Sequence, residues 1–320
     1  MILCVNLNAA IDKIAVVGSF RLNAIHRPQR VLAVPGGKGA NVARGLKCLG
    51  AAAVVAGWVG GFSGQFIEAG LRCEGIETAL VHLDGESRTC MSILDPEQNT
   101  LTEIYEQGEP VPQEKIAEFK QLFRAIVARH AAVTLSGSLP PGVHTDFYGE
   151  LIVIARAAGV PALLDSSGDA LRRGLEVGRP LLIKPNVDEF AALVERKLAH
   201  AADIAAAAME VSARYQTIVV VSMGAEGVIA ANRSELLHVY PPQRAIKNAV
   251  GSGDCTLAGI TYGLTHGFSL AETIKYGVAA GTANALTIET GAFTRADFER
   301  VHAQVTLTKH QNSTLKTQNS

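Results

Sequence analysis

The stretch from Asn248 to Cys255, Asn-Ala-Val-Gly-Ser-Gly-Asp-Cys, constrains this chain most. Two glycines flank Ser252, and Asp254 stands where an apolar helix is predicted to begin. Glycine lets a ligand approach the backbone closely, and the N–H groups at the start of a helix attract anions. The stretch therefore predicts one of two structures. It is a phosphate-binding loop with a carboxylate base beside it, or a glycine-rich turn whose aspartate caps a helix.

The composition favours a soluble enzyme. The chain has 320 residues, of which 48% are apolar, enough for one large α/β domain or two smaller ones. The formal net charge of −1 gives no basic surface for nucleic acid or an anionic membrane. No apolar run approaches the roughly 20 residues that a membrane span needs. Five cysteines without a CxxC pair fit a reducing compartment, so we expect a cytoplasmic protein.

Segments typical of strands and helices alternate along most of the chain. The first is a short apolar run at 2–7, and the last is a helix predicted over 295–305. Alternation of this kind is typical of a parallel sheet covered by helices on both faces. We therefore expect an α/β fold with a doubly wound, mostly parallel sheet over 1–307. Residues 308–320, rich in Gln, Asn, Ser and Thr, are expected to form a disordered tail.

Two segments break this alternation. Within each of the segments 14–35 and 89–105, strand-like runs follow one another without a helix between the strands. Strands joined by turns rather than helices form antiparallel hairpins. These segments predict a small β-sheet inserted into the α/β domain, and such a sheet can act as a lid. The lid is expected to come from about 12–35 and 86–108.

The common nucleotide-binding motifs are absent. Gly39 stands after Gly37-Lys38 where a Walker A loop needs Ser or Thr, and no G-x-G-x-x-G follows the first strand. The run Gly36–Asn41 instead offers an approachable backbone, a lysine and an amide that can bind hydroxyls. It is either a ligand-binding loop or a plain turn with a solvated lysine. Asp12 follows the first strand, at the edge where open α/β sheets bind ligands.

Two further loops at strand ends carry candidate ligands. Asn186 and Glu189 follow Lys184 and lie three residues apart in the first turn of a predicted helix. Both can face one water-coordinated Mg²⁺, although the same pair also fits a capping box with Asn186 as the N-cap. Residues 222–227, Ser-Met-Gly-Ala-Glu-Gly, either hold a phosphate or close a hairpin.

These motifs, in this order, resemble those of the ribokinase-type carbohydrate kinases, also called the phosphofructokinase B family. The first family signature resembles Gly36–Arg44, and the second resembles Val250–Asp254 with the helix behind it. Together with N-x-x-E at 186–189 and S-x-G-x-x-G at 222–227, the resemblance covers about 2–292. It implies a ribokinase-like fold and a transferase that uses ATP and Mg²⁺ to phosphorylate a carbohydrate.

The resemblance implies a role for each matching residue. Asp254 is expected to take the proton from the acceptor hydroxyl, and the N–H groups of Gly251, Ser252 and Gly253 to hold the transferring phosphoryl group. Asn186 and Glu189 are expected to act on Mg²⁺ indirectly, through water. The residues expected at ATP are Lys184, Asn186, Glu189, Ser222, Gly224 and Gly227. Those expected at the sugar are Asp12, Gly36, Gly37, Lys38, Asn41 and Arg88.

Within the family, the sequence is most similar to the branch that acts on phosphorylated hexoses. Lys38 and Arg88 fit that branch, where they are expected to bind the phosphate that the substrate already carries. Otherwise Arg88 is a surface arginine on an exposed strand. The runs at 102–108 and 248–254 are similar to those of tagatose-6-phosphate kinases. The expected reaction converts tagatose 6-phosphate to tagatose 1,6-bisphosphate, with 1-phosphofructokinase and 6-phosphofructokinase as alternatives.

Two other functions stay open. A kinase of an unphosphorylated sugar would not use Lys38 and Arg88 as phosphate ligands, and a non-catalytic sugar-phosphate sensor would not need Asp254 as a base. Ala9 and Ala249 stand where the family usually has proline, without loss of a functional group. Because an inserted sheet has exposed edges, we also expect a homodimer through the lid.

Overall fold

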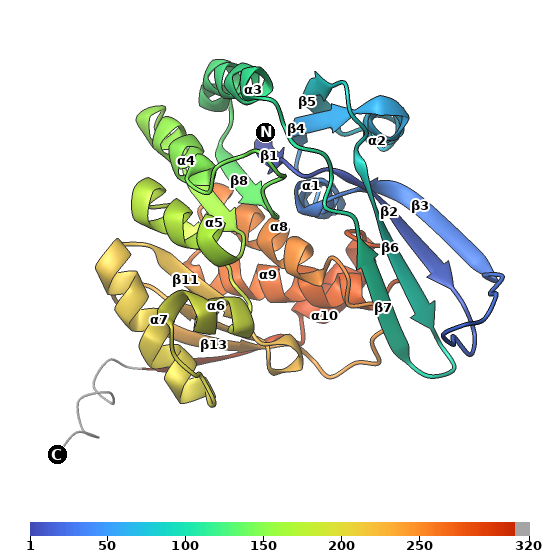
Figure 1. The fold of residues 1–320 in the computed structure, drawn as a ribbon. Coiled ribbons are helices and arrows are strands. Elements are labelled where there is room, and N and C mark those ends of the chain that lie inside the picture. The colour runs from blue at the N-terminus through green and yellow to red at the C-terminus, as the bar shows by residue number, and fades with distance from the viewer. Residues whose placement is uncertain (311–320) are drawn as a thin grey trace.

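The structure, a computed structural model, describes residues 1–310. A ten-stranded sheet forms the centre of this part of the chain (Figure 1). Its strands are β1 (Ile2–Asn6), β4 (Ala53–Gly60), β5 (Glu77–Leu83), β8 (Ala132–Ser136), β9 (Ala162–Asp165), β10 (Leu182–Ile183), β11 (Ile218–Ser222), β12 (Val228–Ala231), β13 (Leu236–Tyr240) and β14 (Thr306–His310). They lie in the order β14-β13-β12-β11-β10-β9-β8-β1-β4-β5. The strands from β11 to β5 run parallel, and the remaining three are antiparallel.

Helices cover both faces of this sheet, so its central strands are buried on both sides. One face is covered by α1 (Lys38–Cys48), α2 (Gly61–Cys73), α8 (Ser252–Thr265), α9 (Leu270–Ala285) and α10 (Arg295–His302). The other is covered by α3 (Gln113–Ile126), α4 (Phe147–Ala157), α5 (Gly168–Arg173), α6 (Val187–Val194) and α7 (Ala201–Tyr215). Each face has its own apolar core, with Phe298 in the first and Phe119 in the second. The predicted doubly wound α/β fold is confirmed.

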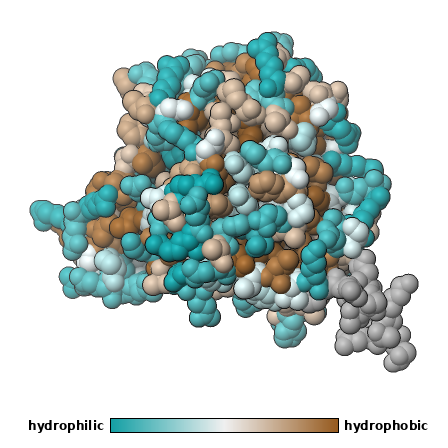
Figure 2. All heavy atoms as spheres, turned by 180° about the vertical axis from the view of Figure 1, so that it is seen from behind, coloured by the Kyte–Doolittle hydropathy of each residue, from teal (hydrophilic) through white to brown (hydrophobic). Residues whose placement is uncertain are grey.

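A second sheet of four strands projects beside the first, and we call it the lid sheet (Figure 1). It consists of β2 (Ala10–Val16), β3 (Arg30–Gly36), β6 (Arg88–Asp95) and β7 (Thr100–Tyr105), in the order β3-β2-β6-β7. These strands come from the two segments predicted to form an inserted sheet, so that prediction is confirmed. Strand β7 is exposed along its whole length. Seen from behind, apolar residues gather on the projecting lid sheet, at the left of the view (Figure 2).

Two details differ from the sequence prediction. Strand β5 is an edge strand that was not predicted, although Ala79, Val81 and Leu83 alternate along it and pack against the second core; it pairs with β4 in parallel. The predicted tail begins too early, since residues 308–310 belong to β14 and pair with β13. The rest of that tail, 311–320, lies outside the described residues. None of the helices in the described residues is long and apolar enough to cross a membrane.

Candidate active site

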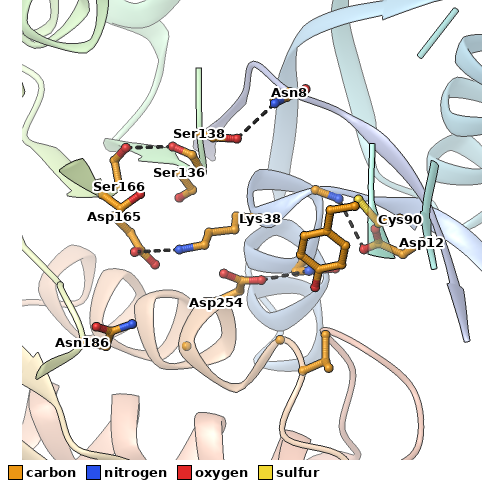
Figure 3. A pocket seen from close by; sticks show the side chains of 18 of the residues that line it. Asn8, Asp12, Lys38, Cys90, Ser136, Ser138, Asp165, Ser166, Asn186 and Asp254 are labelled. Carbon is orange, nitrogen blue, oxygen red and sulfur yellow. Dashed lines mark hydrogen bonds and ion pairs between the residues drawn. The ribbon is translucent and has the colours of Figure 1, made fainter. Parts of the chain in front are cut away.

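The carboxyl ends of the parallel strands and the base of the lid sheet enclose a cavity of about 600 Å³ (Figure 3). Strands β1, β8 and β9 end beside it with Asn6, Ser136 and Asp165. This is the edge at which open α/β sheets bind ligands. The lid sheet contributes Asp12 and Cys90 from its two inner strands. The cavity therefore has one wall from each sheet.

Asp254 lies in the first turn of α8, which follows a tight turn at Gly251. The φ of Gly251 is 81°, in the left-handed region, and a Cβ there would come within 2.8 Å of the backbone nitrogen of Gly291. Glycine is therefore required. The carboxyl of Asp254 is 5% exposed and accepts a hydrogen bond of 2.8 Å from Nδ2 of Asn41.

Burial raises the pKa of Asp254 to about 7, although the charges of Lys38 and Lys184 and the hydrogen bond from Asn41 oppose the rise. A carboxyl that titrates near neutral pH suits a general base. The N–H group of Ser252 donates to the carbonyl of Ala249 at 3.1 Å. Of the three N–H groups predicted to hold an anion, that of Ser252 is therefore already hydrogen-bonded. Within residues 1–310, Gly251 and Gly253 have no acceptor for theirs.

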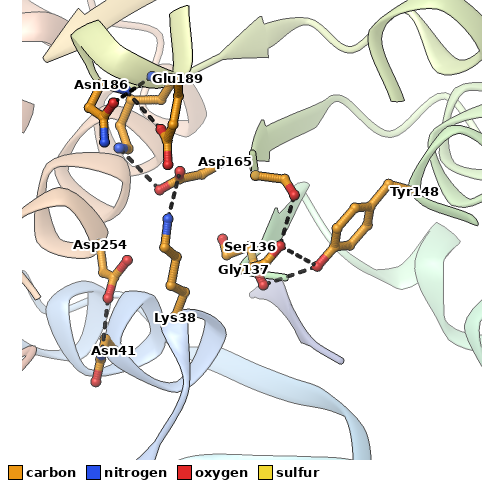
Figure 4. A network of polar contacts seen from close by, with 11 residues as sticks. Lys38, Asn41, Ser136, Gly137, Tyr148, Asp165, Asn186, Glu189 and Asp254 are labelled. Atoms are coloured by element: carbon orange, nitrogen blue, oxygen red, sulfur yellow. Dashed lines mark hydrogen bonds and ion pairs between the residues drawn. The ribbon is translucent and has the colours of Figure 1, made fainter. Parts of the chain in front are cut away.

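Asp165 joins two lysines at the centre of the cavity (Figure 4). Its carboxylate is 1% exposed and pairs with Lys38 Nζ at 3.2 Å and with Lys184 Nζ at 3.1 Å. Burial by itself would raise the pKa of Asp165, but the charges of Lys184 and Lys38 outweigh it and hold that pKa below its usual value. The charge of Asp165 in turn raises the pKa of Lys38. The carboxylate of Asp165 therefore holds both lysines in place.

Asp165 was not among the residues predicted for the site. The signal that was available is its position directly after the apolar run 162–164, which parallels the position of Asp12 after the first strand. Two further residues, neither of them predicted individually as a ligand, also line the cavity. Asn8 and Ser138 come from the ends of different strands, and Nδ2 of Asn8 donates to Oγ of Ser138 at 3.0 Å.

Asn186 and Glu189 form a capping box at the start of α6. Oδ1 of Asn186 accepts from the N–H of Glu189 at 2.8 Å, and Oε2 of Glu189 accepts from the N–H of Asn186 at 2.9 Å. The capping interpretation is therefore correct, and both side chains also line the cavity. Oε1 of Glu189 makes no hydrogen bond within the described residues, which leaves it for a ligand.

Arg88 lines the cavity with its guanidinium tied to two backbone carbonyls. Nε and Nη2 donate to the carbonyl of Asn8 at 3.3 and 3.2 Å, and Nη1 donates to the carbonyl of Glu106 at 2.9 Å. A guanidinium has five N–H groups, so two remain for a substrate. Arg88 is therefore not a free surface arginine. Its anchoring restricts the direction from which it can bind an anion.

The cavity brings together most of the predicted residues. They are Asp12, Gly37, Lys38, Asn41, Arg88, Lys184, Asn186, Glu189, Ser222, Gly251, Gly253 and Asp254. A second cavity, of about 430 Å³, shares Ser222 and Gly253 with the first. It also contains the predicted Gly224, Gly227 and Ser252.

Gly36 lines neither of these two cavities, so the structure does not place it at a ligand. A Cβ at this position would lie 2.2 Å from Cγ of Asp12. Its carbonyl accepts a hydrogen bond of 3.0 Å from Nδ2 of Asn6. Gly36 therefore leaves room for the Asp12 carboxyl instead of contacting a substrate. Burial raises the pKa of Asp12, and the N–H of Gly37 donates to its Oδ2 at 3.4 Å.

The second cavity has mostly apolar walls. Val228 contributes from β12, Val278 from α9 and Ile246 from the loop before Asn248. The φ of Gly227 is 87°, and a Cβ there would lie 2.1 Å from the carbonyl oxygen of Val239. The apolar walls of the second cavity can take a flat apolar group. The residues that it shares with the first cavity form a polar entrance beside them.

Residues 1–296 match the model of the pfkB family carbohydrate kinases. The chain belongs to this family. A tagatose-6-phosphate kinase from Staphylococcus epidermidis is 33% identical over 307 residues, which are 95% of this chain and 98% of the relative. Membership in the family confirms the predicted enzyme class, an ATP-dependent carbohydrate kinase.

Solved structures of pfkB kinases share the fold. Phosphofructokinase-2 from Escherichia coli, in complex with potassium, has a TM-score of 0.88 and 28% identity, covering 95% of this chain and 98% of that one. A structure from Thermotoga maritima described as a possible 1-phosphofructokinase has a TM-score of 0.90 and 28% identity, covering 97% of this chain and all of that one. These similarities confirm the predicted ribokinase-like fold.

Proposed function

We propose that this kinase transfers the terminal phosphoryl group of ATP to tagatose 6-phosphate, forming tagatose 1,6-bisphosphate. The observation that carries the proposal is the buried carboxyl of Asp254 beside the unbonded N–H groups of Gly251 and Gly253. A base and an anion site in contact are what phosphoryl transfer to a hydroxyl requires. The choice of sugar is supported by the tagatose-6-phosphate kinase that matches this chain over nearly its whole length.

The second cavity is proposed to hold the nucleobase of ATP. Its apolar walls suit a flat ring, and its shared residues Ser222 and Gly253 lie where the phosphates would enter the first cavity. Lys184 is 4% exposed and directed at Asp165. We propose that its ammonium stabilises negative charge on the transferring phosphoryl group.

The sugar is proposed to occupy the first cavity between α1 and the lid sheet. The carboxylate of Asp12 and the N–H of Gly37 can bind its hydroxyls, since both line the cavity. The substrate's own phosphate is proposed to contact Lys38 and the two remaining N–H groups of Arg88. Paired cations of this kind favour a phosphorylated acceptor over a free sugar.

In the proposed reaction, Asp254 takes the proton of the acceptor hydroxyl as that oxygen bonds to the terminal phosphorus of ATP and the bond to ADP breaks. The N–H groups of Gly251 and Gly253, with the positive end of α8, stabilise the charge that develops on the phosphoryl oxygens. The lid sheet closes one side of the cavity. Exclusion of water keeps the phosphoryl group from being transferred to water instead.

A magnesium ion is implied by the use of ATP, and the residues present fit an indirect role. Within residues 1–310, no group of three His, Cys, Asp or Glu side chains could hold a metal ion. Mg²⁺ usually keeps several waters and binds through one or two carboxylates and the phosphates. Oε1 of Glu189 is the group proposed to bind such a water, and the ion would supply charge neutralisation at the phosphates.

We further propose a cytoplasmic homodimer in which two lid sheets meet. The most exposed large apolar side chains are Leu22 and Ile25, at the tip of the lid, and Ile104 on its edge strand is 59% exposed. The related phosphofructokinase-2 from Escherichia coli is tetrameric in its inhibited form. The five cysteines are all free, which fits a reducing compartment.

The deciding experiment measures ADP release with Mg-ATP and four acceptors, namely tagatose 6-phosphate, fructose 1-phosphate, fructose 6-phosphate and free fructose. The highest kcat/KM is expected with tagatose 6-phosphate. A preference for fructose 1-phosphate would instead make the enzyme a 1-phosphofructokinase, the function named for the Thermotoga maritima structure. Equal use of free fructose would refute the phosphate-binding roles of Lys38 and Arg88.

A further inference from the structure

Asn41 is held between two charged groups. Its Nδ2 donates to Oδ2 of Asp254 at 2.8 Å, and its Oδ1 accepts from Nη1 of Arg44 at 2.9 Å (Figure 4 shows the first of these bonds). A side-chain amide can turn by 180° and exchange the positions of its oxygen and nitrogen. In the turned orientation, its oxygen would face the carboxylate and its NH₂ group would face the guanidinium. Arg44 therefore favours the orientation that presents a donor to Asp254.

Arg44 is itself fixed from two other directions. Its Nε donates to Oε2 of Glu74 at 2.6 Å, and its Nη2 donates to the carbonyl of Pro35. Pro35 lies in β3 of the lid sheet, and Glu74 directly follows α2. The side chain of Arg44 is 9% exposed. The guanidinium thus links the lid sheet and α2 to the amide that contacts the base.

We propose that Arg44 is a positioning residue, which orients the Asn41 amide so that the base Asp254 keeps its hydrogen-bond donor. The inference rests on the proposed function, in which Asp254 takes the proton from the sugar. Arg44 does not line the cavity of about 600 Å³, so it does not touch the substrate. Toward Asp254 it acts through Asn41, which lies three residues before it on the same face of α1. The charge of Arg44 also opposes the raised pKa of Asp12.

The other charged groups around Asp254 do not depend on Arg44. Lys38 faces the carboxyl from α1, Asp165 from the end of β9, and Lys184 from the loop after β10. Each of the two lysines is paired with Asp165. Among the described residues, Arg44 itself has four charged neighbours, which all line a third cavity: Glu74, Asp12, Lys47 and Glu289. Of these, Glu74 pairs with it directly, at 2.6 Å between Oε2 and Nε. Replacing Arg44 therefore removes one defined influence on the base.

A third cavity, of about 420 Å³, gives access to this network. Arg44, Glu74 and Cys48 line it together with apolar residues of the lid sheet such as Leu32. Truncation of Arg44 to alanine would join the space of the lost side chain to this cavity. A guanidinium ion from solution can then occupy the gap and bond to Glu74 and Asn41, as the native side chain does.

The test compares Arg44→Ala and Arg44→Lys with Lys47→Ala as the control. Lys47 is on the same helix, and it also bonds to Glu74 but not to Asn41. We expect Arg44→Ala to lower kcat by about 100-fold, the size of effect that a slight misplacement of a reacting group can have. The acid limb of the kcat/KM profile should move to higher pH, because Asp254 loses a donor that favours its charged form.

Guanidinium chloride, at concentrations far below those that unfold proteins, should restore several-fold activity to Arg44→Ala and none to the control. Arg44→Lys keeps the charge but lacks the planar fork, so it should stay impaired and shifted in its acid limb. If Arg44→Ala does not fold, the acid limb of Arg44→Lys carries the test.

Folded variants with the wild-type rate and acid limb would overturn the inference. So would a lower rate with an unshifted acid limb and no response to guanidinium, because that pattern indicates only a structural role. Absence of kinase activity in the wild-type protein would count against the proposed function instead. The two failures are therefore distinguishable.

Discussion

The ammonium of Lys184 lies 3.1 Å from the carboxylate of Asp165, and the two side chains are only 4% and 1% exposed. Burying an ion pair to this degree has a large desolvation cost. Loss of one partner then strongly destabilises the fold, because the other charge stays buried without compensation. The same carboxylate also holds Lys38 at 3.2 Å. Asp165 thus holds two lysines at fixed positions in one cavity, Lys38 proposed at the sugar phosphate and Lys184 proposed at the phosphates of ATP.

Loss of that carboxylate should destabilise the fold. We expect Asp165→Ala to reduce the free energy of unfolding by about 3 kcal/mol or more, because Lys184 would be left buried without its partner. Urea denaturation measures this change. Asp146→Ala is the matched control, since its pairing with Arg173 is half-exposed and should contribute little. Equal stability of the two variants would contradict the structural role of Asp165.

The pKa of about 7 for Asp254 predicts the direction of the pH dependence. A base must be deprotonated, so kcat/KM should rise with pH through about 7 and level off above it. Asp254→Asn should lose most turnover while still binding the sugar phosphate, as measured by calorimetry. Unchanged turnover in this variant would show that Asp254 is not the base.

The same raised pKa has a consequence for stability. The folded carboxyl binds its proton more tightly than the unfolded one, so it contributes stability below the unfolded pKa that is lost as pH rises through about 7. Asp254→Asn should therefore be more stable than the wild type at pH 8, and the difference should shrink at acid pH. Thermal melts of both proteins at several pH values measure this difference. A difference that does not change with pH would contradict the prediction.

Arg88 is predicted to determine the preference for a phosphorylated acceptor. Arg88→Ala should raise the KM for tagatose 6-phosphate by about 10- to 100-fold, the equivalent of one charge-assisted hydrogen bond, and leave the KM for ATP nearly unchanged. Lys13→Ala is the control, because Lys13 is also in the lid sheet but does not line the cavity. A KM that changes equally in both variants would argue against a phosphate contact.

Gly227 and Gly224 offer a matched pair at the proposed nucleotide cavity. Both have positive φ, but a Cβ would lie 2.1 Å from the carbonyl oxygen of Val239 at Gly227, and it would meet nothing within 4 Å at Gly224. Gly227→Ala should therefore raise the KM for ATP more than Gly224→Ala. Steady-state kinetics with saturating sugar phosphate would test the order.

The proposed dimer predicts an effect of charge at the lid tip. Ile25 is 88% exposed, and Ile25→Asp should yield a monomer by static light scattering if two lids bury this region. Val153→Asp, on the exposed side of α4 and remote from the lid (Figure 1), is the control and should not change the mass. A wild-type protein that is monomeric would exclude the dimer.

Much of the candidate site was predictable from local sequence. Gly251 and Gly37 have positive φ angles, a backbone conformation that favours glycine. The glycines themselves therefore indicate these turns in the sequence. Lys184 follows an apolar run, which places it at the ligand edge of the sheet. Asp12 was predicted at the same edge but lines the cavity from within β2 of the lid sheet.

The remainder depends on tertiary packing. Asp165 is 127 positions from Lys38, and no local pattern shows that they pair. The anchoring of Arg88 depends on backbone carbonyls of two other segments. Strand β5 was predictable in principle, since Ala79, Val81 and Leu83 alternate along it. The capping box and the water-mediated contact to Mg²⁺ proposed for Glu189 share one spacing, so only the structure could show that its cap leaves one oxygen without a partner in the described residues.

Most of the groups proposed to bind the sugar phosphate are part of the lid sheet or of its base, and Lys38 is the first residue of α1. Asp12 lies within β2, Arg88 begins β6, and Gly37 directly follows β3. The acceptor site is therefore complete only while the lid sheet lies against the α/β domain. The second cavity, in contrast, has no lining residue from the lid sheet. A change in the lid sheet is therefore expected to alter acceptor binding and to leave the proposed nucleotide cavity as it is.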